Sequence, residues 1–93
     1  MSTLKEIVKS PSTIVVDVRS PWEYEMDHIP GAKNIPLEEV PGKVEEFKAF
    51  KSPLVIYCRS GNRSGMAVSI LKQNGVAEVY NGGSLGDMQF LLN

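Results

Sequence analysis

The chain has only one cysteine, one histidine and one tryptophan among its 93 residues. A single cysteine excludes an internal disulfide, which fits a reducing compartment where a thiol stays available for chemistry. The single histidine, His28, is far in sequence from Cys58, so the chain offers too few soft ligands for a metal ion. We therefore expect no metal site.

Excess charge and long apolar runs are also missing. The formal net charge is −1, which gives no electrostatic case for binding nucleic acid or an anionic membrane surface. No apolar run approaches the roughly 18 residues of a membrane span, and the N-terminal stretch MSTLKEIVKS has no apolar signal core. We expect one small domain over residues 1–93, located in the cytoplasm, with no nucleic-acid partner and no membrane contact.

Apolar strands alternate with helical patterns along the chain. Apolar, mostly β-branched runs at Thr13–Val18 and Leu54–Cys58 predict strands that are covered on both faces, and shorter stretches around Ala32–Ile35 and Val76–Tyr80 predict two more strands. Capping boxes and apolar residues at helical spacing predict helices near residues 3–9, 21–27, 42–50, 63–74 and 84–93. Pro36 and Pro41 bracket a predicted loop, and the NGG stretch at 81–83 predicts a turn. This pattern predicts an α/β fold with a small parallel sheet of about four to five strands, flanked by helices on both faces.

The stretch from Cys58 to Arg63, CRSGNR, lies between a predicted strand and a predicted helix. Ligands bind at the carboxyl ends of parallel strands, and Cys58 ends its strand. Gly61 and Asn62 are residue types that tolerate the left-handed backbone of a tight turn, so the loop amides and the helix start predict an anion site. Arg59 and Arg63 add positive charge there.

A thiol in such a site ionises easily, because amides, a helix start and arginines all favour the thiolate. A lone cysteine in an apolar strand is more often a small buried hydrophobe. The glycine, the asparagine and the two arginines that follow Cys58 favour the nucleophile instead.

Three segments together resemble the single-domain rhodanese family, the thiosulfate sulfurtransferases. CRSGNRS resembles the family's active-site loop, VVDVRSPWEYEMDHIPGAKNIP its first signature, and VYNGGSLGDM its closing segment. The resemblance implies a rhodanese-like parallel α/β sheet and a cysteine that carries a persulfide sulfur between a donor and an acceptor.

The resemblance also implies roles for individual residues. Cys58 would be the nucleophile, and the amides around the transferred sulfur would come from Arg59, Ser60, Gly61, Asn62 and Arg63. Asp17 would support the loop region through hydrogen bonds, with Ser64 as a further supporting residue. Arg19 would be either the ion-pair partner of a carboxylate or a charge at the rim of the site.

Other residues of the matched segments have plainer expected roles. His28 would hold the turn before PGA rather than act as a base, and Trp22 and Tyr24 would pack around their short helix. The family commonly has tryptophan near the position of Asp87, so the last helix of this chain is expected to be shorter or to pack differently.

Loop length separates sulfur chemistry from phosphorus chemistry. Cysteine phosphatases, and a phosphatase and arsenate-reductase branch with the rhodanese fold, place five residues between cysteine and arginine. Here four residues separate Cys58 from Arg63, and the next position is Ser64. A ring shortened by up to about 3.5 Å of chain suits one sulfur atom better than a tetrahedral oxyanion, and serine cannot clamp phosphate as arginine does.

The expected reaction is therefore a double displacement without an organic cofactor. A small anionic donor, thiosulfate or another persulfide, would pass its outer sulfur to Cys58, and cyanide, a thiol or a protein acceptor would remove it. A persulfide relay or a binding module for one protein partner remains an alternative, and a cysteine phosphatase or arsenate reductase is a weaker one.

Overall fold

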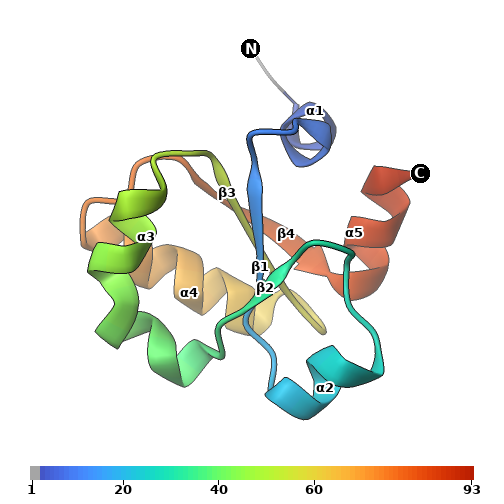
Figure 1. The fold of residues 1–93 in the computed structure, drawn as a ribbon, viewed down its shortest axis with the longest axis horizontal. Coiled ribbons are helices and arrows are strands. Elements are labelled where there is room, and N and C mark those ends of the chain that lie inside the picture. The colour runs from blue at the N-terminus through green and yellow to red at the C-terminus, as the bar shows by residue number, and fades with distance from the viewer. Residues whose placement is uncertain (1–2) are drawn as a thin grey trace.

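The computed structural model describes residues 3–93 and is built around one four-stranded sheet (Figure 1). All pairings are parallel and the strand order is β2-β1-β3-β4. The strands are β1 (Ile14–Asp17), β2 (Lys33–Asn34), β3 (Leu54–Cys58) and β4 (Val79–Ser84). The predicted parallel α/β sheet is confirmed, with four strands.

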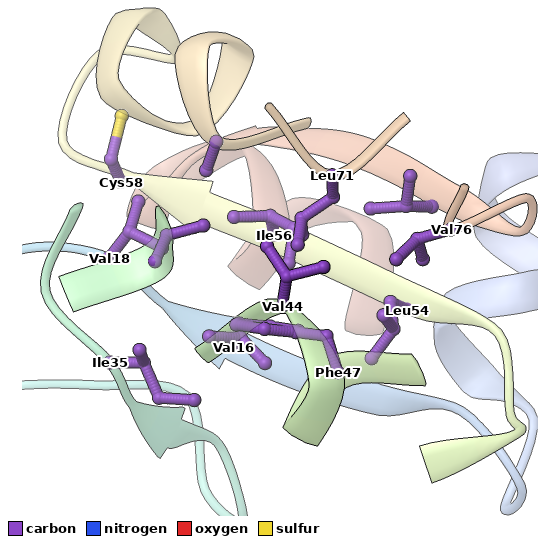
Figure 2. Packing of buried hydrophobic residues seen from close by; sticks show 13 residues of the cluster. Val16, Val18, Ile35, Val44, Phe47, Leu54, Ile56, Cys58, Leu71 and Val76 are labelled. Atoms are coloured by element: carbon purple, nitrogen blue, oxygen red, sulfur yellow. The ribbon is translucent and has the colours of Figure 1, made fainter. Parts of the chain in front are cut away.

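Helices cover both faces of the sheet, as predicted (Figure 1). They are α1 (Leu4–Lys9), α2 (Pro21–Met26), the 3₁₀ helix η1 (Leu37–Lys43), α3 (Val44–Phe50), α4 (Asn62–Gln73) and α5 (Leu85–Leu92). One apolar cluster joins the sheet to η1, α3 and α4, and Figure 2 shows Phe47, Leu71 and Val76 packed there against β1 and β3. A second cluster joins the other face to α1 and α5 through Val8 and Met88.

Strand β3 lies at the centre of the sheet because both of its faces are apolar. All five of its residues are buried, and it pairs with β1 on one side and β4 on the other. Ile56 faces the first cluster, while Val55 and Tyr57 face the second. Because both faces of β3 are buried, the strand has a fixed register in the sheet, and its last residue, Cys58, has a fixed position at the carboxyl edge.

Two of the expected elements differ from the structure. The last strand begins at Val79 and continues to Ser84, so the NGG stretch belongs to β4 and does not form a turn. Val76 is instead tied to the end of α4, where its N–H donates to the carbonyl of Leu71 at 2.9 Å. The expected loop between Pro36 and Pro41 lies mostly within the 3₁₀ helix η1.

The glycines of β4 permit the close approach of α5. The register with β3 skips Gly82, since Ile56 pairs with Asn81 and Tyr57 pairs with Gly83. A Cβ atom on Gly82 would lie 2.5 Å from the sulfur of Met88 and 2.8 Å from a methyl group of Val55. The strand has glycine at this point because its neighbours leave no room for a Cβ atom.

Capping boxes set the starts of three helices. Thr3 with Glu6, Ser20 with Glu23, and Ser84 with Asp87 form reciprocal boxes at the starts of α1, α2 and α5. Asp87, which stands near the expected tryptophan position, therefore has a structural role as a cap. The helix that it begins packs on the sheet through the fully buried Met88.

No helix within residues 3–93 combines the length and the apolar character needed to cross a membrane.

Candidate functional site

Cys58 is the last residue of the central strand, at the carboxyl edge of the sheet. It pairs with Ser84 of β4 and is fully buried. Figure 2 shows its side chain at the end of β3, with the sulfur directed toward the neighbouring helix. The strand thus places the thiol at the edge where parallel sheets bind ligands.

Backbone amides point at this sulfur from two places. The N–H of Gly61 donates to the Cys58 sulfur at 3.0 Å, and the N–H of Ser64, in the first turn of α4, donates to it at 3.4 Å. Gly61 makes this turn possible with a φ of 94°, a value that L residues rarely adopt. The loop and the helix start therefore form the nest of amides that the sequence predicts around this atom, although substrate binding by the loop residues stays a prediction.

Two opposing effects act on the Cys58 thiol. Burial raises its pKa, while the Ser64 hydroxyl and the backbone N–H groups of Ser64, Ser60 and Gly61 lower it through hydrogen bonds. The hydrogen bonds outweigh burial, so the pKa of Cys58 lies below its ordinary value. The site therefore favours the thiolate, which is the nucleophilic form.

A polar cluster that the sequence did not reveal lies behind the sulfur. The Ser64 hydroxyl is 3.4 Å from the Cys58 sulfur and donates to the Asn81 Oδ1 at 2.7 Å. The Asn81 Nδ2 donates to the Gly61 carbonyl at 3.1 Å, so this side chain connects β4 to the loop. Nothing in the local sequence signals this contact, because the NGG stretch resembles a turn.

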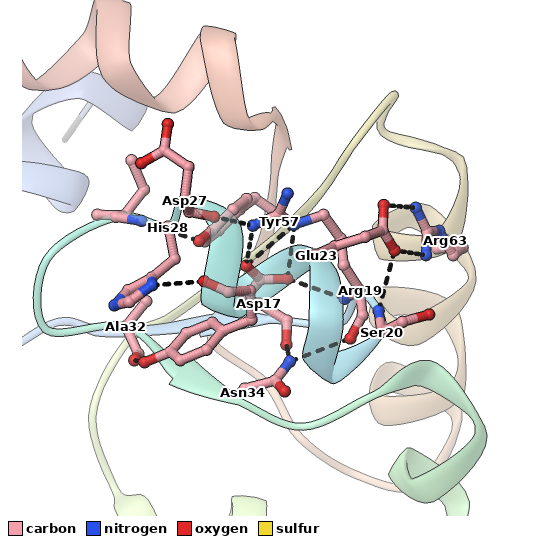
Figure 3. A network of polar contacts seen from close by, with 12 residues as sticks. Asp17, Arg19, Ser20, Glu23, Asp27, His28, Ala32, Asn34, Tyr57 and Arg63 are labelled. Atoms are coloured by element: carbon pink, nitrogen blue, oxygen red, sulfur yellow. Dashed lines mark hydrogen bonds and ion pairs between the residues drawn. The ribbon is translucent and has the colours of Figure 1, made fainter.

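Arg63 is held by a carboxylate and does not stand free at the loop. Its guanidinium donates to both carboxylate oxygens of Glu23, at 2.8 and 3.2 Å, as Figure 3 shows. The hydrogen bonds from Arg63 bring the pKa of Glu23 down to about 2. Glu23 also completes the capping box at the start of α2 by accepting from the Ser20 N–H at 3.0 Å.

Arg59 lies on the open side of the loop. It is exposed and lines a hollow of about 330 Å³. The other walls of the hollow are Arg19, Trp22, Glu23, Met26, Asp27 and Leu85. Trp22 is 62% exposed and Met26 78% exposed, so the expected packing role of Trp22 is wrong: α2 turns its ring outward into this hollow.

The Asp17–Arg19 pair forms a separate network (Figure 3). The Arg19 guanidinium donates to the Asp17 carboxylate at 2.7 Å and to the carbonyl of Asp27, at the end of α2, at 2.6 Å. Both side chains are buried. Of the two roles considered for Arg19, the structure favours the ion pair. The carboxylate of Asp17 accepts from the backbone N–H and the guanidinium of Arg19, and among the described residues no hydrogen bond joins it to residues 59–63, so the expected direct hydrogen-bond support of the loop is not seen.

His28 contacts Tyr24 through both its edge and its face. Its Nδ1 is 2.7 Å from the Tyr24 carbonyl, and the two rings stack with centroids 3.7 Å apart. The Tyr24 hydroxyl donates to the Ala32 carbonyl at 2.6 Å. These contacts agree with a structural role for His28 in holding the turn that follows α2.

Within residues 3–93, no group of three or more histidine, cysteine, aspartate or glutamate side chains is placed to hold a metal ion.

Comparison with known proteins gives consistent matches. A family model described as "Rhodanese-like domain" matches residues 1–85. The "Uncharacterized protein YqhL" of Bacillus subtilis is 43% identical over 67 residues, which cover 72% of this chain and 52% of that protein. The "Thiosulfate sulfurtransferase PspE" of Escherichia coli is 40% identical over 74 residues, which cover 78% of this chain and 71% of that protein. The solved structure described as "rhodanese with anions from E. coli" has a TM-score of 0.74 at 38% identity and covers 81% of this chain and 89% of its own. The chain therefore spans about half the length of the Bacillus relative.

Proposed function

Because the chain belongs to the Rhodanese-like domain family, we propose that it is a sulfurtransferase that carries a sulfane sulfur on Cys58. The observation that supports this proposal most directly is the pair of backbone N–H groups, of Gly61 and Ser64, that donate to the Cys58 sulfur. Such donors stabilise the negative charge of an attacking thiolate and of the persulfide that replaces it.

The proposed reaction has two displacements at sulfur. The Cys58 thiolate attacks the outer sulfur of thiosulfate, the sulfur–sulfur bond of the donor breaks, and sulfite leaves with the bonding electron pair. Cys58 then carries a persulfide. An acceptor such as cyanide or a thiolate attacks the outer sulfur of the persulfide, and the Cys58 thiolate is restored.

The chain's own residues supply charge stabilisation and position. The loop amides hold the sulfur, and the start of α4 adds its dipole. Arg59 is the arginine of the loop that is open to solvent, so it is our candidate for attracting the anionic donor. Arg63 supplies weaker attraction, because Glu23 offsets its charge.

A relay that serves a larger partner is the second candidate. The hollow beside Arg59, with its exposed Trp22 and Met26, is larger than thiosulfate needs and favours an organic or protein group next to the loop. The two candidates differ in the acceptor and share the Cys58 persulfide.

Cys58→Ser tests the shared step, because serine cannot form a persulfide. We expect thiocyanate formation from thiosulfate and cyanide to be abolished, with circular dichroism showing that the fold is kept. Mass spectrometry of the wild type should show one added sulfur on Cys58 after thiosulfate, and cyanide should remove it. Substantial thiocyanate formation by the variant would contradict the proposal. Turnover of an aryl phosphate by the wild type, lost in Cys58→Ser, would favour a phosphatase instead.

A further inference from the structure

The Asn81 side chain is fixed by three hydrogen bonds around the loop. Its Oδ1 accepts from the Ser64 hydroxyl at 2.7 Å and from the Gly83 N–H at 2.9 Å, and its Nδ2 donates to the Gly61 carbonyl at 3.1 Å. These partners settle the orientation of the amide, because a flipped amide would face the Gly83 N–H with its own donor. Asn81 therefore presents a fixed acceptor to Ser64.

The Ser64 hydroxyl has two neighbours but only one proton to donate. When that proton points at Asn81, the Ser64 oxygen can only accept from the Cys58 thiol, 3.4 Å away. This arrangement stabilises the protonated thiol. The thiolate has no proton to donate, so it gains from Ser64 only when the hydroxyl turns away from Asn81. The lowering of the Cys58 pKa by the Ser64 hydroxyl therefore requires this turn.

We propose that Asn81 is a positioning residue that competes with the Cys58 sulfur for the single hydroxyl proton of Ser64, and so limits how readily the thiol ionises. The thiol proton leaves to a base in solution, and Ser64 keeps its own proton and exchanges one acceptor for another. Asn81 Oδ1 retains the Gly83 N–H after the exchange, so no polar atom is left without a partner. The proposal concerns ionisation of Cys58, and its relevance to catalysis depends on the proposed sulfur transfer.

Arg59 directly follows Cys58 and is exposed, and the other charged groups at this carboxyl edge of the sheet lie on or next to four elements. Arg63 of α4 interacts electrostatically with the thiolate and is paired with Glu23 of α2. Asp17 of β1 is paired with Arg19, which follows the same strand. Asp87 of α5 accepts from the Ser84 N–H. Replacing the neutral Asn81 by alanine changes none of these charges, so a change in ionisation would report on the hydrogen bonds.

The test is the rate of Cys58 alkylation by iodoacetamide as a function of pH, because this reagent reacts with the thiolate whether or not sulfur transfer occurs. Asn81→Ala frees the Ser64 proton for the sulfur, so the midpoint should fall and alkylation below it should become about two- to tenfold faster. Asn81→Asp holds that proton more strongly and adds negative charge, so alkylation there should become about tenfold slower or more. Ser64→Ala should also slow alkylation, because the thiolate then loses the hydroxyl that can turn to donate to it.

The double variant Ser64→Ala/Asn81→Ala separates competition from simple support of the loop. If Asn81 acts through Ser64, the double variant should match Ser64→Ala, and the gain from Asn81→Ala should vanish. The proposal is overturned if Asn81→Ala slows alkylation, leaves it unchanged, or speeds it equally with and without Ser64. Failure of thiosulfate turnover with the expected alkylation pattern would refute the proposed function while leaving the role of Asn81 intact.

Discussion

Replacing Gly83 by alanine tests the close packing of β4 against the capping box at the start of α5. Gly83 has a φ of 87°, and an added Cβ atom would lie 2.5 Å from the Asp87 Oδ2. That oxygen accepts from the Ser84 N–H and completes the capping box of α5. The substitution therefore strains the backbone and displaces the cap.

Two terms give the magnitude. A non-glycine residue in the left-handed region costs about 1–2 kcal/mol, and loss of a cap costs about 1 kcal/mol. The free energy of unfolding should therefore fall by about 2–3 kcal/mol, which corresponds to roughly 10–20 °C in melting temperature for a domain of this size.

Thermal and urea unfolding followed by circular dichroism would measure the loss, with Gly42→Ala as a matched control. Nothing lies within 4 Å of a Cβ atom built on Gly42, which has no positive φ, so the control should change stability by no more than about 0.5 kcal/mol or raise it slightly. Asp87→Ala removes only the cap, so it should lower the free energy of unfolding by about 1 kcal/mol. Equal stability of Gly83→Ala and the wild type would refute this reasoning.

Two further predictions concern loop length and acid stability. Inserting one residue between Gly61 and Asn62 should widen the amide ring and slow sulfur transfer about 10- to 10⁴-fold through one or two lost charge-assisted hydrogen bonds; unchanged thiocyanate formation would contradict the importance of the short loop. The Arg63 pair lowers the pKa of Glu23 from 4.5 to about 2, so its stabilisation is full above pH 4.5 and is lost as the pH falls toward 2. Since Arg63 is partly exposed, we expect this pair to contribute about 1–2 kcal/mol to the free energy of unfolding. Between pH 5 and 2.5 the free energy of unfolding should therefore fall less in Glu23→Gln than in the wild type. An equal fall in both proteins would contradict this prediction.

The central strands and the cysteine loop were predictable because their causes are local. Residues 54–58 form an unbroken apolar run, and Gly61 follows within the span of one turn. An apolar run predicts burial on both faces of a strand, and a glycine in a short loop predicts a left-handed backbone, so both features can be predicted from a few neighbouring residues. The same is true of the capping boxes that begin α1 and α2.

The contacts that complete the site were not predictable because they join distant segments. Arg63 and Glu23 are 40 residues apart, and the local capping role of Glu23 already accounted for its presence. Asn81 lies 17 residues from Ser64 and reaches it only because β4 continues through its glycines. That continuation depends on Met88 packing over Gly82, a tertiary contact that strand propensity does not report.

The position of Arg63 bears on the choice between sulfur and phosphorus. A phosphatase needs a guanidinium that faces the transferred phosphoryl group and donates to two of its oxygens, because the negative charge is shared among those oxygens. Here two nitrogens of the Arg63 guanidinium are bound to the carboxylate of Glu23, and the groups that reach the Cys58 sulfur are two neutral amide N–H groups and the Ser64 hydroxyl. N–H donors that converge on one atom suit a negative charge located on a single sulfur atom. A thiolate and then a persulfide would place such a charge there during sulfur transfer. The ion pair that stabilises α2 against α4 thus supports sulfur together with the short loop.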